Sequence, residues 1–182
     1  MADNEFGYTL WGRDWVRLAE PLRQTRPEPL LPRARSIARN DGVGIEIEGR
    51  TVRAHLHRGG QASIAHVEVA PLSRAAVTAI GHTITDPTIL TDEMHRALLD
   101  EGHSPAPSLV STDCSCSART ARCVHVFAML YTIARKVDEN PRLALELQGY
   151  FDATTDSDLP TQEPRWTSIN SLDPSRFFVP VS

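Results

Sequence analysis

The sequence predicts an α+β fold: a small antiparallel β-meander packed with helices, then a segment of β-strands and helix around a cysteine–histidine cluster, and a mostly irregular C-terminal tail. Three observations lead to this prediction. Apolar residues alternate with polar ones between residues 43 and 69, and they recur at helical spacing on either side of that region. After residue 151, threonine, aspartate, serine and proline dominate. The length of 182 residues suits one domain with a small appendage.

The meander is predicted from alternation and turn residues. Val43, Ile45 and Ile47 alternate with polar residues or glycine, and turns are expected at Gly49-Arg50 and Gly59-Gly60. One face of such a sheet is buried and needs a helix to cover it. The predicted strands are residues 43–48, 51–57 and 64–69.

Helices are predicted on both sides of the meander. Asp86 is the expected N-cap of one of them, with Pro87 at its first position. Residues 101–112 contain Gly102, Pro105 and Pro107, which predict a linker or an irregular approach to the following segment. The other predicted helices are 11–22, 33–39, one capped by Ser73, 124–137 and 143–150.

Charge argues against a dedicated DNA-binding protein. The chain carries 19 basic and 23 acidic residues, a formal net charge of -4, whereas DNA-binding domains are usually basic. Residues 138–182 hold eight acids and three arginines, so the body before them is nearly neutral and rich in arginine. Of the 19 basic residues only Lys136 is a lysine. This preference for arginine either favours bidentate contacts to phosphate or carboxylate groups, or it reflects codon usage alone.

The three cysteines all lie within residues 114–123. An odd number of cysteines is a poor disulfide framework, and clustering beside a histidine is typical of metal binding. The spacing is C-x-C, six residues, then C-x-H, with the last pair at the start of a predicted helix. Four such ligands suit a tetrahedral zinc ion and leave no position for a catalytic water. We therefore expect one structural Zn²⁺ bound by Cys114, Cys116, Cys123 and His125, and we expect the six other histidines to be solvated.

This ligand pattern, with the apolar helix that follows it, resembles the SWIM zinc finger. Trp11-Gly12-Arg13-Asp14-Trp15 also resembles the W-G-x-x-W opening of bacterial SWIM-domain proteins, and the similarity covers roughly residues 8–150. The resemblance implies strands and a helix around one zinc ion, no catalytic activity, and binding to DNA or proteins. It also implies a role beside a large DNA-processing enzyme such as an SNF2-type helicase.

Three functions compete at this stage. The first is a non-catalytic adaptor that docks a large protein partner, with the tail residues Trp166, Phe177 and Phe178 either docking on that partner or folding back on the core. The second is direct, sequence-nonspecific nucleic-acid binding through Arg119, Arg122, Arg135 and Lys136, with an earlier cluster of Arg33, Arg35 and Arg39. The third is catalysis by Cys123 and His125, which their common orientation toward a metal disfavours.

The expected organisation has three parts. Residues 1–100 form an α+β region, residues 101–150 the finger with its following helices, and residues 151–182 an acidic, flexible tail with an aromatic end. No apolar run approaches the roughly 20 residues of a membrane span. The N-terminus has no signal-peptide core, so we expect a cytoplasmic protein without a membrane partner or a small-molecule substrate.

Overall fold

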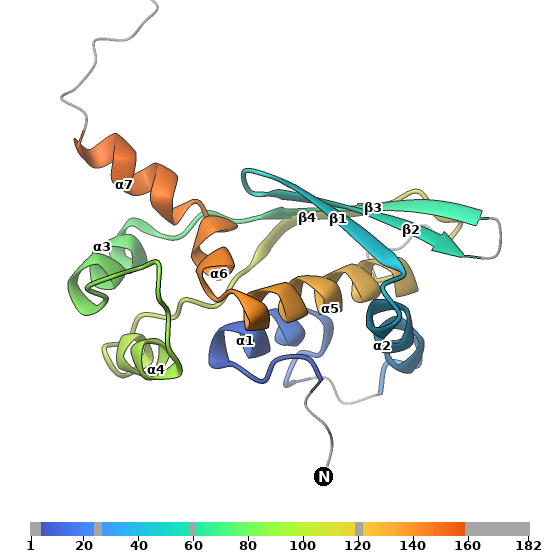
Figure 1. Ribbon diagram of the computed structural model, residues 1–182, viewed down its shortest axis with the longest axis horizontal. Helices are drawn as coiled ribbons and strands as arrows, with labels where there is room; N and C mark the ends of the chain where they lie inside the picture. Colours follow the sequence, from blue (N-terminus) through green and yellow to red (C-terminus); the bar gives the residue numbers. More distant parts are fainter. Residues whose placement is uncertain (1–4, 24–26, 59–60, 119–121, 159–182) are drawn as a thin grey trace, which may run out of the picture.

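The fold is α+β, with a four-stranded antiparallel sheet whose strands lie in the order β1-β2-β3-β4 (Figure 1). The computed structural model describes residues 5–23, 27–58, 61–118 and 122–158. The strands are β1 (Val43–Glu48), β2 (Thr51–Arg58), β3 (Gln61–Val69) and β4 (Leu109–Cys114). The helices are α1 (Leu10–Ala19), α2 (Leu31–Arg39), α3 (Arg74–Thr83), α4 (Asp92–Asp100), α5 (Val124–Glu139), α6 (Arg142–Glu146) and α7 (Tyr150–Asp158).

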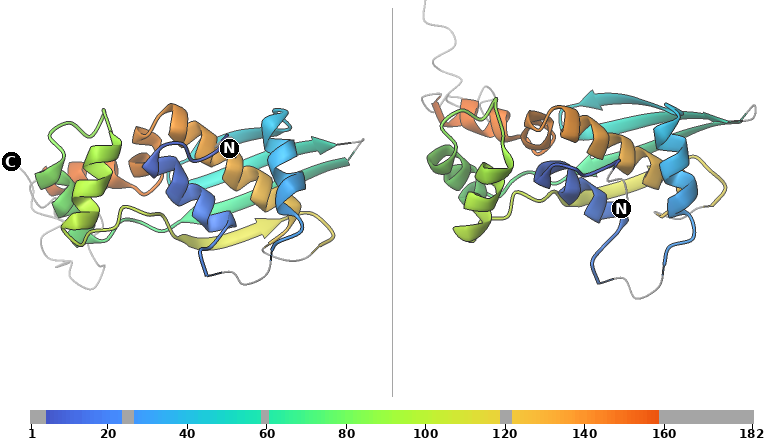
Figure 2. Two further views of the ribbon diagram at one scale, coloured as in Figure 1. Left: turned by 90° about the horizontal axis from the view of Figure 1, so that it is seen from below. Right: turned by 60° about the horizontal axis from the view of Figure 1, so that its bottom comes forward.

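Helix α5 is the centre of the molecule. It runs along one face of the sheet, and α1 and α2 pack against it (Figures 1 and 2). The strands present small, fully buried residues to it, and Ala54 of β2 pairs directly with Ala65 of β3. Because these side chains end at Cβ, a helix approaches the sheet closely and fills the space with its own larger side chains. Phe127, Met129 and Leu130 of α5 are all buried.

The predicted three-stranded meander is confirmed and extended by a fourth strand. Residues 109–112, the end of the predicted linker, form β4 together with Asp113 and Cys114, and β4 pairs with β3 in a register that sets Ala65 opposite Cys114. A bulge at Glu68 and Val69 adjusts the pairing. The free hydrogen-bonding edge of β3 explains this pairing, because an unpaired strand edge favours a partner strand. The extra strand ends at the first predicted metal ligand.

Two predicted helix boundaries are wrong for local reasons. Asp86 does not cap a helix: its carboxylate accepts hydrogen bonds from the backbone and hydroxyl of Thr88 and forms a turn. Helix α4 starts later, where the Thr91 hydroxyl accepts from the Met94 backbone. Helix α1 stops before Pro21, so Leu22 is 83% exposed instead of sharing the buried face of Trp11 and Trp15.

The segment after α5 is helical further than expected. Gly149, at φ 71°, separates the short helix α6 from α7. Helix α7 covers residues 150–158, so the first part of the tail that was expected to be irregular, residues 151–158, is helical. The remainder of that segment, with Trp166, Phe177 and Phe178, lies outside the described residues.

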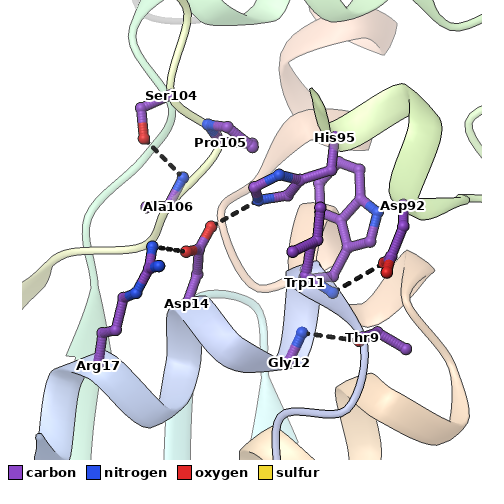
Figure 3. A network of polar contacts seen from close by, with 12 residues as sticks. Thr9, Trp11, Gly12, Asp14, Arg17, Asp92, His95, Ser104, Pro105 and Ala106 are labelled. Carbon is purple, nitrogen blue, oxygen red and sulfur yellow. Dashed lines mark hydrogen bonds and ion pairs between the residues drawn. The ribbon is translucent and has the colours of Figure 1, made fainter. Parts of the chain in front are cut away.

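One histidine that was expected in solvent is buried. His95 of α4 is 2% exposed, and its Nε2 lies 2.7 Å from Oδ2 of Asp14 in α1, which is 5% exposed (Figure 3). The Trp11 ring packs edge-on against the imidazole, and its indole N–H donates to the Thr91 carbonyl at 3.0 Å. The W-G-x-x-W segment therefore joins α1 to α4.

We expect Asp14→Ala to lower the free energy of unfolding by about 3 kcal/mol, because it leaves a buried imidazole without its partner. Among the described residues, no partner is found for Nδ1 of His95, so the variant would leave both ring nitrogens unpaired. Arg17→Ala is the control: its guanidinium also bonds Asp14, at 2.9 Å, but is 45% exposed and contributes about 0–1 kcal/mol. Urea unfolding of both variants measures the difference; equal losses would contradict the assigned role of the buried pair.

Candidate metal centre

The four predicted ligands meet at one point. Cys114 ends β4, Cys116 lies in the turn that follows, Cys123 is the N-cap of α5, and His125 lies in the first turn of that helix. Their ligand atoms all lie within 4.8 Å of one another. The pairing of β4 with β3 and the start of α5 thus bring together two pairs of ligands that are seven to eleven positions apart in the sequence.

The separation of these atoms fits a single tetrahedral metal ion. With zinc–sulfur bonds of about 2.3 Å and zinc–nitrogen bonds of about 2.0 Å, a tetrahedron places sulfur and nitrogen about 3.5 Å apart. Sγ of Cys114 and Nδ1 of His125 are 3.7 Å apart. The Cys114, Cys116, Cys123 and His125 group could therefore hold one metal ion with little rearrangement.

The ionisation of the ligands follows from their surroundings. Burial, with hydrogen bonds to the two other thiols, raises the pKa of Cys114 to about 12. Burial also acts to raise the pKa of Cys116, but hydrogen bonds from the Ala118 backbone and the neighbouring thiols outweigh it and lower that pKa. Burial and the positive charge of Arg33 lower the pKa of His125, which keeps the imidazole neutral with a lone pair for a metal.

The start of α5 supplies further stabilisation for a site of several thiolates. Cys123 has extended backbone at the N-cap, and its side chain makes no capping hydrogen bond within the described structure. The free N–H groups and the dipole of this 16-residue helix give its N-terminus a partial positive charge. The side chain of an N-cap residue normally accepts a hydrogen bond from the first turn of the helix, whereas here the thiol faces the other three ligands.

The arginine next to the cluster has a structural partner. The Arg122 guanidinium donates to the carbonyl of Ala19 at 3.2 Å, and it lies over the Phe127 ring at 4.9 Å from the ring centre. It therefore ties the metal loop to the end of α1 and to α5. Arg119, predicted to act beside it, lies outside the described residues.

The two other predicted basic residues are distant from the ligands. Arg135 and Lys136 lie near the C-terminal end of α5, and at 1.5 Å of rise per residue His125 is about 16 Å away along the helix. Arg135 donates to the Asp41 carboxylate at 2.7 Å. Lys136 is exposed and lines a shallow groove with Glu139. Of the four residues in this predicted basic group, only Arg122 among those that the structure describes therefore lies beside the metal centre.

Of the earlier arginine cluster, two members are engaged within the protein. Arg35 bonds Glu20 and the Tyr131 hydroxyl, and Arg39 bonds Glu5. Arg33, in contrast, is exposed and lies beside the metal centre. The three are close in the chain, but on α2 Arg35 and Arg39 are four residues apart and share a face, whereas Arg33 lies on another face of the helix.

We expect Arg122→Ala to destabilise the protein by about 1 kcal/mol through loss of its carbonyl and ring contacts. Thermal unfolding of the metal-loaded variant measures this effect. Lys136→Ala is the control, because its exposed side chain should leave the melting temperature unchanged. If Arg122→Ala instead had no effect on stability but flattened the salt dependence of nucleic-acid binding, the residue would be a phosphate contact.

Comparison with known proteins gives no family assignment: no family model matches the chain, and no curated protein or solved structure matches it. The resemblance to the SWIM zinc finger therefore stays a prediction from the ligand spacing and the W-G-x-x-W segment. None of the described helices combines the length and the apolar character needed to cross a membrane. The metal centre is thus the feature from which function is inferred.

Proposed function

We propose that this chain is a non-catalytic, zinc-dependent binding module of the SWIM type, which docks a larger DNA-processing protein. The observation that carries the proposal is the convergence of three thiols and one imidazole within 4.8 Å. Cysteine and histidine in this ratio are preferred ligands of zinc, and four protein ligands complete its usual coordination. The ion would be held by Cys114, Cys116, Cys123 and His125.

A filled site has a structural role. The bound ion would supply a cross-link, because Cys114 and Cys116 belong to the end of β4 and Cys123 and His125 to the start of α5. Catalytic zinc sites keep one position open for water, and four protein ligands leave none. Cys123 and His125 serve as ligands of the same ion, which leaves neither free to act as nucleophile or base. We therefore propose no enzymatic activity.

A protein partner is favoured over nucleic acid by charge. The chain has a net charge of -4, and Arg122 and Arg135 are committed to contacts within the protein. Nucleic-acid binding depends on several cations that are free to neutralise phosphates. The free thiols also suit a reducing compartment such as the cytoplasm. The resemblance adds the class of partner, an enzyme like an SNF2-type helicase.

The test begins with metal analysis of the protein purified from its own cells, where we expect one zinc ion per chain. A pull-down of the tagged, zinc-loaded protein is then compared with and without nuclease. A large partner that is retained after nuclease treatment, and lost with the Cys123→Ser variant, is the expected result. Partners that disappear on nuclease treatment would replace the proposal by its alternative, direct binding to nucleic acid.

A further inference from the structure

A hollow of about 490 Å³ opens beside the metal centre. Helix α2, strands β2 and β3 and the loop after β4 form its walls, and Cys116, Cys123 and His125 contribute directly to the lining. We call it the α2 hollow. Its volume lies in the range of sites that enclose a small ligand or one large side chain.

The lining combines an apolar interior with a basic rim. Leu30, Ile37, Leu56 and Val124 are buried or half-buried, whereas Arg33, His57 and Arg122 are exposed. Among the described residues, two arginines line the hollow and no aspartate or glutamate does, in a chain whose acids outnumber its bases. An occupant that fits this lining is apolar at its centre and negatively charged at its edges.

Arg33 is the residue of the basic rim whose positive charge is available to a partner. It lies in the first turn of α2, and the ion pairs and hydrogen bonds found among the described residues include none from its guanidinium. A cation there gains nothing for the helix, because the helix N-terminus is itself partly positive. Its exposed position at the mouth of the hollow leaves it ready for an acidic group of a partner.

We propose that the α2 hollow binds a large apolar side chain, best an aromatic one, carried by an acidic segment of the partner protein. This inference rests on the proposed adaptor function and names the chemistry of the partner. Single aromatic side chains that fill a pocket, with charges around them, are the usual anchors of protein interfaces. A nucleic-acid backbone would pair with Arg33 but would leave the half-buried side chains of Leu30 and Ile37 without an apolar partner.

The metal would control this site. Three of its four ligands line the hollow, so loss of the ion would release one wall. Three thiolates around a divalent ion carry one net negative charge, which the two arginines exceed. Binding of an acidic segment would therefore depend on zinc and would weaken as salt rises.

The probe is a five-residue peptide, blocked at both ends, with one tryptophan between two pairs of acidic residues. Titration into zinc-loaded, ¹⁵N-labelled full-length protein should shift the amide signals of Gly42 and Val124, which line the hollow. Replacing the tryptophan by serine, or the acids by lysines, should lower the affinity at least about tenfold. A six-nucleotide thymidine strand that shifts the same amides more tightly would overturn the proposal in favour of nucleic acid.

Two charge reversals show whether the acidic peptide binds at the α2 hollow or is attracted only by the overall charge of the protein. Arg33→Glu should weaken the acidic peptide at least about tenfold, whereas Arg74→Glu should change it less than about twofold. Arg74 is a matched control, since it is also exposed, occupies the first turn of a helix, α3, and lies away from the hollow. Equal losses in both variants would overturn the proposal.

A third variant, Ser63→Trp, fills the hollow from β3 and should abolish peptide binding while zinc content stays at one ion per chain. A Ser63→Trp protein that still binds the peptide would also overturn it. The pull-down distinguishes failure of the α2 hollow as a binding site from failure of the adaptor function. If the partner is retained by Arg33→Glu as well as by the parent chain, this site is wrong and the adaptor stands; if the parent retains no partner, the adaptor itself fails.

Discussion

Cys123→Ser is expected to lose the metal ion and to lower the melting temperature by about 10 °C or more. Metal binding contributes about 10–16 kcal/mol in small zinc modules, and removing one of three thiolates gives up much of it. Cys123 is 2% exposed and begins α5, so the loss acts on the helix at the centre of the core. At roughly 2–4 °C per kcal/mol for a chain of this size, even about 4 kcal/mol gives a shift of this order.

The measurement pairs metal analysis with thermal unfolding. Ser117→Ala is the matched control, because Ser117 lies in the same loop, is exposed and supplies no ligand. We expect it to keep one ion per chain and the parent melting temperature. A Cys123→Ser protein that retained both its metal and its stability would show that the four residues do not act as one site.

Chelation of the parent protein tests the same site without a mutation. Removing zinc should make all three thiols reactive toward a thiol reagent, whereas the loaded protein should protect them, because a coordinated thiolate is held by the ion. Restoring zinc should restore both protection and stability. Protection that survives chelation would mean that burial alone shields the thiols.

The metal ligands were predictable because the information is local. Four residues with metal-binding side chains lie within twelve positions, and the helical pattern that follows places two of them at the start of a helix. The meander was predictable for the same reason, since its alternation and its turn residues are read within a few positions. Such features depend little on the rest of the fold.

The features that were missed depend on contacts between distant parts of the chain. Strand β4 has only six residues and no clear alternation, and the edge of β3 determines its conformation. Asp14 and His95 are 81 positions apart, and Arg122 reaches Ala19 across 103 positions. Because no local pattern marks a residue whose partner lies that far away, His95 was predicted to face solvent and Arg122 to contact a nucleic acid or a partner.

The α2 hollow also depends on contacts between distant parts of the chain. Its apolar lining comes from α2, β2 and the start of α5, so no stretch of sequence contains it. The only local signal was an arginine, Arg33, in the first turn of a helix, where a positive charge is unfavourable. A charged residue that is unfavourable for its own helix and gains no contact within the protein marks a candidate binding site.

Gly12, the glycine of the W-G-x-x-W segment, lies where α1 approaches the end of α5, and we expect a large effect from its substitution. A Cβ atom on Gly12 would lie 2.1 Å from Oδ1 of Asp138. That carboxylate is buried at the end of α5 and accepts hydrogen bonds from the Gly7 and Thr9 backbone and from the Thr9 hydroxyl, at 2.6, 2.9 and 2.7 Å. Gly12 is therefore the residue that lets α1 and its preceding turn close on α5.

Gly12→Ala is expected to lower the free energy of unfolding by about 4 kcal/mol, a fall in melting temperature of about 12 °C. The added methyl group would displace either α1 or the Asp138 carboxylate, and displacement of the carboxylate breaks bonds to a buried charge. Gly81→Ala is the matched control in α3, where the nearest atom is the Tyr150 hydroxyl at 3.7 Å. There alanine should stabilise the helix by about 0.5–1 kcal/mol. Two substitutions of equal chemistry should thus have opposite signs, and a Gly12→Ala protein as stable as its parent would disprove the close approach of α1 to Asp138.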